Sequence, residues 1–313
     1  MSRPRATIGA FLSGMCIGAA DLVPGISGGT VALILGMYGA IINGLRSIDG
    51  DFFKLLFRGQ FKDASVLVPL GFLGAVVGGM LFSIATLVHV IKAILADPVY
   101  KPMLYALFLG LVLASAVLIF RRIQNFKPIY LLWGLLAAGA AFYLSGLELP
   151  KQAITSSYSA VVDLWAFFCG MLGICAMLLP GISGGYLLNV LGMYGNIIDA
   201  LSTFIHGIVH FHMEWAAFFL LLNLGLGVLI GAIVFSRAIS WALTNYHDLT
   251  ISVLVGFMLG ALRSVWPFIN DINEPFLPPF TEPLLWSAVA LTILGFTAVS
   301  TAHNLALKAK ANV

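Results

Sequence analysis

Long apolar runs separated by short polar connections dominate the chain. Six of them cover residues 66–94, 103–120, 129–146, 215–243, 250–268 and 284–303. A helix needs roughly 20 mainly apolar residues to cross a hydrocarbon core of about 30 Å. The pattern therefore predicts six membrane-spanning helices in an all-α polytopic membrane protein.

A shorter pair of apolar runs precedes each group of three. In the first pair, residues 7–20 and 30–46 would form helices of about 21 Å and about 25 Å, which are too short to span. The loop between them, broken at 24–29, holds a proline and three glycines that do not continue a helix. Two short helices that enter and leave the membrane on the same face form a re-entrant hairpin. Such a hairpin is tolerated only where protein or a watery cavity provides hydrogen-bond partners for its backbone.

The second pair, 164–205, repeats the first and is broken at 180–185. Residues 24–45 and 180–201 are identical at 14 of 22 positions, at a fixed offset of 156. Unrelated segments of this length would share roughly one or two positions, so the chain contains an internal duplication. We expect two repeats, 1–150 and 151–313, each with one hairpin and about three spanning helices.

Composition supports a membrane protein. With 60% hydrophobic residues, 9% charged residues and a mean hydropathy of +1.02, the chain carries more apolar surface than a soluble domain could bury. The net charge of +3 is small, and the basic residues form no patch that would bind nucleic acid. Cys16, Cys169 and Cys175 lie in apolar runs without metal-ligand spacing, so neither a metal, a disulfide nor a cofactor is expected.

Basic residues indicate the orientation. They gather near both termini and in two connections, whereas the loop holding Asp271, Glu274 and Glu282 and the linker 147–160 fall on the other side and are expected outside. The basic residues are Arg3, Arg5, Arg46, Lys54, Arg58, Lys62, Arg121, Arg122, Lys127, Lys308 and Lys310. The positive-inside rule places this set, and both termini, in the cytoplasm. Re-entrant hairpins then leave an odd number of crossings per half, so the repeats are inverted. Ten full crossings would satisfy the same rule.

The duplicated loop has the composition of an anion site. Its candidate ligands are the backbone and hydroxyl groups of Ser27, Gly28, Gly29 and Thr30, and of Ser183, Gly184, Gly185 and Tyr186. Each set begins a helix, where N–H donors and the positive dipole end favour negative charge. The alternative is that small residues merely allow close helix packing. Two matching inverted copies favour a site near the midplane.

Asp21 breaks the symmetry between the copies. It stands three residues before the first break, and its counterpart is Met177. A carboxylate at membrane depth suits a proton or coupling-ion site. The alternative is that Asp21 caps the next helix or pairs locally with a basic residue.

Three arginines and several asparagines are further candidates. Arg263 is the most deeply placed arginine and could bind a phosphate through its planar fork, or extend to the outer surface. Arg237 and Arg46 could reach the cavity from the inner side or be ordinary helix-end charges. The asparagines Asn43, Asn189 and Asn223 could donate to an anion or bond between helices.

The histidines and the missing catalytic motifs point away from an enzyme. His206, His210 and His212 could approach a metal, but with Phe204, Phe211 and Trp215 they fit an interfacial helix better. The sequence has no nucleophile elbow, Walker loop or HExxH motif.

The paired PGISGG segments, each followed by LGMYG, resemble the signature of the bacterial polyprenyl-phosphate transporter (PopT-type) family over essentially the whole chain. The resemblance implies recycling of undecaprenyl phosphate, the lipid carrier of cell-envelope synthesis, from the outer to the cytoplasmic leaflet of the bacterial inner membrane. Its implied partners are this lipid and the membrane. The resemblance does not decide whether the protein forms a homo-oligomer. The other classes considered are a secondary transporter of a small soluble anion, a membrane-embedded lipid phosphatase and a structural assembly factor.

Overall fold

The protein is an all-α polytopic membrane protein. The computed structural model describes residues 4–23, 27–146, 161–180, 183–270 and 274–311. The first half contains α1 (Pro4–Asp21), α2 (Gly28–Ile34), α3 (Tyr38–Arg46), α4 (Gly50–Phe57), α5 (Phe61–Leu67), α6 (Leu70–Ala96), α7 (Tyr100–Phe120) and α8 (Pro128–Leu144). The second contains α9 (Leu164–Leu178), α10 (Gly184–Val190), α11 (Tyr194–Val209), α12 (Trp215–Asn245), α13 (His247–Gly260), the 3-10 helix η1 (Ala261–Val265) and α14 (Pro283–Ala311).

Among the described residues, five helical segments are long and apolar enough to cross a membrane. They are α6, α7, α12, the continuous α13–η1 segment and the first 19 residues of α14. The sixth predicted span, 129–146, corresponds to α8, which has 17 residues and belongs with the shorter apolar helices α1 and α9. Seventeen residues lie at the lower limit for a span.

The helices pack in pairs, and the pairing in one half resembles that in the other. Within each half, the first hairpin arm packs along the first long helix, α1 on α6 and α9 on α12. Between halves, α7 packs on α14 and α8 on α13. Glycines allow the backbones to touch: a Cβ at Gly79 would lie 2.0 Å from the Phe11 carbonyl oxygen, and one at Gly227 would lie 1.9 Å from that of Phe167. Such contacts are typical of membrane helix packing.

The second arm of each hairpin is two helices, whereas the sequence predicted one helix over 30–46. α2 ends at Ile34, and α3 leaves it at 115°. Gly36 has φ +69°, its N–H bonds to the Leu33 carbonyl, and the next N–H bonds to Ala32. This Schellman turn ends the helix, and Gly192, with φ +71°, ends α10 in the same way. The glycine of each LGMYG motif is therefore a helix terminator.

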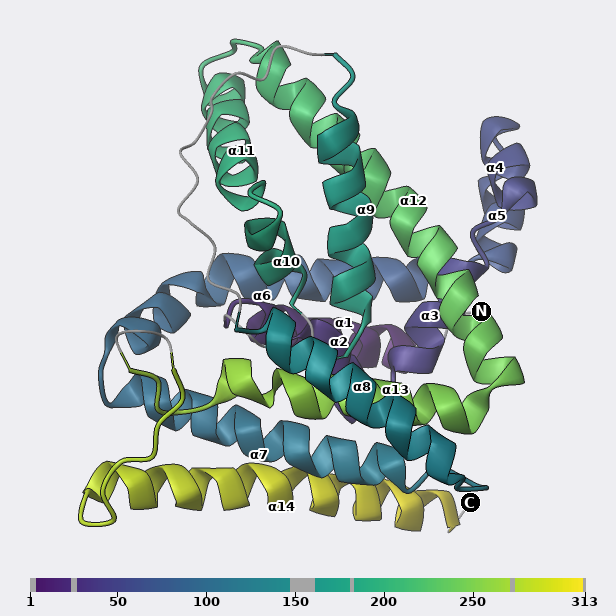
Figure 1. Ribbon diagram of the computed structural model, residues 1–313. Coiled ribbons are helices and arrows are strands. Elements are labelled where there is room, and N and C mark those ends of the chain that lie inside the picture. Colours follow the sequence, from purple (N-terminus) through teal and green to yellow (C-terminus); the bar gives the residue numbers. More distant parts are fainter. Residues whose placement is uncertain (1–3, 24–26, 147–160, 181–182, 271–273, 312–313) are drawn as a thin grey trace.

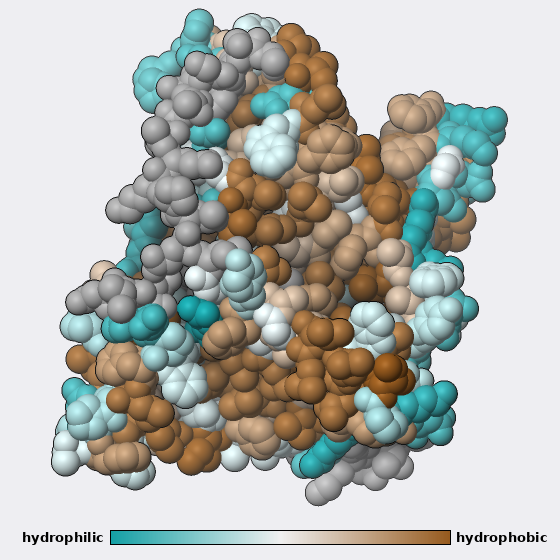
Figure 2. Space-filling view, viewed as in Figure 1, coloured by the Kyte–Doolittle hydropathy of each residue, from teal (hydrophilic) through white to brown (hydrophobic). Residues whose placement is uncertain are grey.

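The first hairpin packs among the lower helices, and α9 to α11 of the second rise away from them (Figure 1). In this view α9 to α12 stand at a steep angle to α6, α7 and α14, and the N- and C-terminal marks lie on the same side. The short helices α4 and α5, which the sequence did not predict, project beside α12. Apolar side chains cover most of the face in Figure 2, as contact with lipid tails requires.

Several sequence predictions lie outside the described residues. They concern the linker 147–160, Asp271, and parts of the two breaks, residues 24–26 and 181–182.

Candidate functional site

The first break packs against the second hairpin inside the protein. Ser27 and Thr30, at the start of α2, are 2% and 1% exposed. The Ser27 hydroxyl donates a hydrogen bond of 3.1 Å to the Leu179 carbonyl, just after α9. A Cβ at Gly29 would lie 2.8 Å from the Met177 carbonyl oxygen. The first break therefore packs directly on the end of the second hairpin's first arm.

Asp21 caps the helix that follows the first break. The Gly28 N–H donates to Asp21 Oδ1 at 2.8 Å, and a Cβ at Gly28 would lie 2.7 Å from both carboxylate oxygens. The capping alternative therefore describes this contact. The Gly28 N–H and the Ser27 hydroxyl, two of the donors expected to bind an anion, are engaged within the protein. Asp21 Oδ2 is buried without a hydrogen-bond partner among the described residues.

The second break lacks this internal carboxylate. Met177 replaces Asp21, and its Cβ would lie 3.1 Å from a Cβ at Gly184. Ser183 caps α10 through a longer contact, accepting from the Tyr186 N–H at 3.4 Å. Gly184 is buried, but Gly185 is exposed. The second copy therefore offers an accessible helix start where the first is closed by a carboxylate.

Tyr186 and Arg263 both reach the C-terminal end of α8. The Tyr186 hydroxyl donates to the Leu144 carbonyl at 2.6 Å. The guanidinium carbon of Arg263, from η1, lies 4.8 Å from the Phe142 ring centroid, a cation–π arrangement. A Cβ at Gly146 would lie 2.2 Å from the same carbon, so only glycine leaves room for this side chain. The end of α8 thus joins the second hairpin to the arginine.

Arg263 carries an available positive charge. It is half-buried, and it forms no ion pair with any carboxylate in the part of the chain that the structure describes. A guanidinium presents a planar set of donors that matches a phosphate. Together with the second break, it could bind one anionic group.

The other two candidate arginines lie at a different place. Arg46 donates to the Ser240 hydroxyl at 2.7 Å, and Arg237 donates to the Ile48 carbonyl at 2.9 Å. Both side chains are exposed, and both bonds connect the end of α3 and the residues after it to α12. In the structure these two arginines therefore connect the end of α3 and the residues after it to α12, and they do not lie at the second break.

The asparagines are also dispersed. The Asn223 amide donates to the carbonyls of Val161 and Phe219, which satisfies it within the start of the second half. Asn189 is exposed on α10, close in sequence to the second break, and Asn43 is exposed on α3.

The histidine segment forms the end of α11 and the turn after it. The rings of His206 and His210 stack at 4.0 Å, and His212 lies 3.7 Å from Glu214. Phe211 is fully exposed. Among the described residues, no cluster of three or more metal-ligating side chains occurs.

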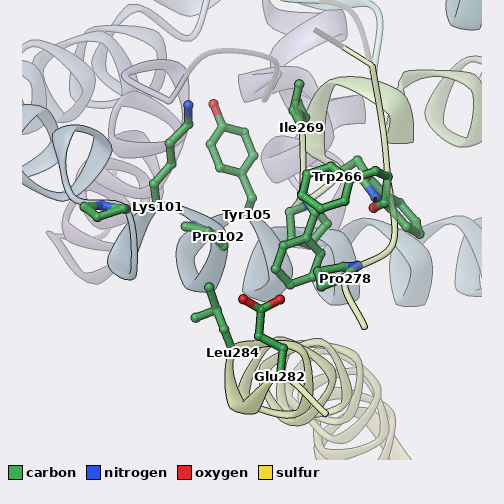
Figure 3. A pocket seen from close by; sticks show the side chains of 12 residues that line it. Lys101, Pro102, Tyr105, Trp266, Ile269, Pro278, Glu282 and Leu284 are labelled. Carbon is green, nitrogen blue, oxygen red and sulfur yellow. Dashed lines mark hydrogen bonds between the residues drawn. The ribbon is translucent and has the colours of Figure 1, made fainter. Parts of the chain in front are cut away.

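A cavity of about 290 Å³ lies between α7, the start of α14 and the chain after η1. Figure 3 shows Lys101 and Tyr105 on one side and Glu282 on the other, near Trp266. A cavity lined by both a cation and a carboxylate is less suited to an anion than Arg263, because the carboxylate repels negative charge.

Sequence reasoning missed the residues at the end of α8. Phe142, Leu144 and Gly146 lie in an apolar stretch, and their roles depend on partners that are distant in the chain. One signal was available: Tyr186 takes the position that Thr30 holds in the first copy, so only the second copy has a long hydroxyl-bearing side chain there.

The fold is that of a multi-pass helical membrane protein, in which the first break packs on the end of α9 and in which Tyr186 and Arg263 both contact the C-terminal end of α8. Residues 17–276 match the family described as VCA0040-like, undecaprenyl phosphate translocase-like, and the chain belongs to this family. It is 35% identical over 267 residues to a polyprenyl-phosphate transporter of Vibrio cholerae, covering 84% of this chain and 79% of the relative. It is 31% identical over 265 residues to a polyprenyl-phosphate transporter of Staphylococcus aureus, with 82% and 85% covered. No solved structure gives a significant match.

Proposed function

We propose that this protein carries undecaprenyl phosphate from the outer to the cytoplasmic leaflet of the bacterial inner membrane, and so recycles the lipid carrier of cell-envelope synthesis. The observation that carries the proposal is the convergence of Arg263 and the second break on the end of α8. Membership of the family and the names of both relatives support a polyprenyl phosphate as the substrate.

The lipid poses a problem that this arrangement can solve. A phosphate is prohibitively costly to bury in hydrocarbon unless it is paired and hydrogen-bonded. The isoprenoid chain can remain in the lipid throughout, so the protein needs only a polar path for the headgroup. Arg263 supplies a full positive charge, and the accessible start of α10 at Gly185 supplies backbone donors. Ser183, Gly184 and Tyr186 complete this proposed headgroup site.

The first break plays a different part in the proposed mechanism. Its buried contacts with Leu179 and Met177 form an internal wall for the site. Asp21 Oδ2, buried without a described partner, is a place where a proton or cation can bind, because an isolated charge there is costly. We assign Asp21 to coupling, with the inward movement of that ion driving transport.

Alternating access follows if the two halves are inverted. The matching pairs α1–α6 and α9–α12, and the exchanged pairs α7–α14 and α8–α13, are the contacts expected of two related halves. The basic connections then face the cytoplasm, together with both termini. The headgroup site lies between halves that can rock against each other.

The test is leaflet-resolved detection of undecaprenyl phosphate in cells with and without the protein. The proposal predicts that the lipid accumulates in the outer leaflet when the protein is absent. An unchanged leaflet distribution contradicts it. Uptake of radiolabelled phosphate by the same cells would support the soluble-anion alternative, and phosphate release from the lipid by the purified protein would support the phosphatase alternative.

A further inference from the structure

A second site with lipid-like chemistry lies at the other end of the α8–α13 seam. A groove of about 370 Å³ opens between α7, α8 and α13. Its floor contains Gly134 and Gly256, whose backbones touch: a Cβ at Gly256 would lie 2.1 Å from the Gly134 carbonyl oxygen. Because the two glycines contribute no side chains, a channel remains between the larger side chains Phe120, Leu135 and Leu259.

The walls of the groove are apolar. Ser252 lines the floor, but its hydroxyl donates to the Tyr130 carbonyl at 2.6 Å and is therefore satisfied within the protein. Leu135 lines the groove and is 60% exposed, so an apolar ligand in the groove would cover it. Such a channel fits a hydrocarbon chain, since a water-filled groove with these walls is unfavourable.

One arginine stands at the end of the groove. Arg121, directly after α7, lines it and is exposed. It forms no ion pair within the described ranges of the chain. The turn after it is fixed, because Asp248 accepts from the N–H groups of Gln124 and Asn125 at 3.1 and 2.8 Å. His247 also contacts this carboxylate at 3.0 Å, so its charge is engaged within the turn.

We propose that this groove binds the isoprenoid chain of a polyprenyl monophosphate, with the phosphate on Arg121. The complementarity is twofold: an apolar channel matches the single hydrocarbon chain, and a cation at its end matches the single anionic headgroup. The site rests on the proposed function and extends it, because it binds the same lipid at the end opposite Arg263.

The position of the groove gives it a role in the transfer. Arg263 follows the end of α13, and Ser252 lies 11 residues before it, a separation of about 16 Å along a helix. A cation therefore lies near each end of the α8–α13 seam: Arg263 in η1 at one end, and Arg121, which follows α7, beside the groove at the other. Since Arg121 belongs to the basic turn assigned to the cytoplasmic side, the groove is the docking place of the lipid after its headgroup has crossed.

The experiment uses the purified full-length protein in phosphatidylcholine nanodiscs. The probe is a polyprenyl monophosphate with a diazirine in its isoprenoid chain, and labelled peptides are mapped by mass spectrometry. We expect label on α8 between Leu131 and Ala138. Leu135→Trp should reduce this label about tenfold by filling the groove. Leu136→Trp is the matched control, since Leu136 is also exposed, at 55%, on the same helix but does not line the groove.

The headgroup contact is tested by Arg121→Gln, with Arg122→Gln as the neighbouring control. Loss of one charge-assisted contact should weaken labelling about tenfold in Arg121→Gln alone. Equal labelling of the Leu135→Trp and Leu136→Trp proteins overturns the groove assignment, as does displacement of the label by a hundredfold excess of phosphatidylglycerol. If the wild-type protein transports the lipid but α8 is unlabelled, the groove fails and the proposed function stands. If it neither transports nor binds the probe, the proposed function fails.

Discussion

Replacing Arg263 by alanine removes the full positive charge from the proposed headgroup site. The side chain stacks 4.8 Å from the Phe142 ring centroid and lies against Gly146. A hydrogen bond to a charged group contributes about 1.5 to 3 kcal/mol, and each 1.4 kcal/mol is a factor of ten. We therefore expect Arg263→Ala to weaken polyprenyl phosphate binding by roughly one to two orders of magnitude.

The same substitution also removes a cation–π contact, which contributes about 0.5 to 1 kcal/mol at an exposed site and more when desolvated. Its effect on folding must be separated from its effect on binding. Arg263→Lys retains the charge but loses the two-pronged geometry, so it should restore only part of the affinity. Arg122→Ala, which removes an exposed arginine away from the site, should bind normally.

The assay is equilibrium binding of a short-chain polyprenyl monophosphate to each purified variant in detergent, after size-exclusion chromatography and a thermal-unfolding scan. The predicted order of affinity is wild type, then Arg263→Lys, then Arg263→Ala. Unchanged affinity in a well-folded Arg263→Ala protein would refute the assignment. Arg237 and Arg46 would then be the next positions to examine.

Three further predictions concern coupling, packing and orientation. Asp21→Asn retains an oxygen to accept from the Gly28 N–H, so it should fold and bind lipid but lose gradient-dependent transport; normal transport across pH and sodium concentration would make Asp21 structural. Gly79→Ala should destabilise the protein by about 1 to 3 kcal/mol in thermal unfolding, whereas Gly74→Ala, which has open space, should not. A cysteine at Glu282 should react with an impermeant thiol reagent from outside; labelling only from the cytoplasm would reverse the orientation.

The sequence predicted the helical class and most of the long helices because apolar periodicity and run length are local properties. It located both breaks in the helices, because PGISGG removes helix-forming residues twice at the same offset, and the re-entrant arrangement of the hairpins stays a prediction. It did not predict the split at Gly36, although this glycine in LGMYG is a typical terminator. The apolar residues on either side read as one continuous helix, and the turn at Gly36 is defined by two backbone hydrogen bonds that no sequence pattern shows.

The site was less predictable because its contacts join distant parts of the chain. Tyr186 bonds to Leu144, and Arg263 stacks on Phe142, across separations that no local pattern records. The sequence did indicate that Asp21 lacks a counterpart at Met177. It left two roles open, and only the bond to Gly28 identified the cap.

This asymmetry affects how the duplicated loops can work. In the first copy the Asp21 carboxylate accepts a hydrogen bond at the start of α2. In the second copy Met177 lies at the corresponding position beside the start of α10. When Asp21 is ionised, it repels a negative ligand from the first helix start, whereas no carboxylate of the protein competes with a ligand at the second. The duplication therefore provides two similar hairpins, of which we propose that one carries the coupling group and the other the headgroup.

The central claim is that the headgroup crosses the membrane through this protein, past Arg263. The most direct measurement reconstitutes the purified protein in liposomes that carry a fluorescent polyprenyl phosphate in the outer leaflet, and then adds an impermeant phosphatase from outside. The account predicts a protected fraction that grows with time for the wild type, under an imposed ion gradient, and is strongly reduced for Arg263→Ala. Equal protection in wild-type, Arg263→Ala and protein-free liposomes would contradict it.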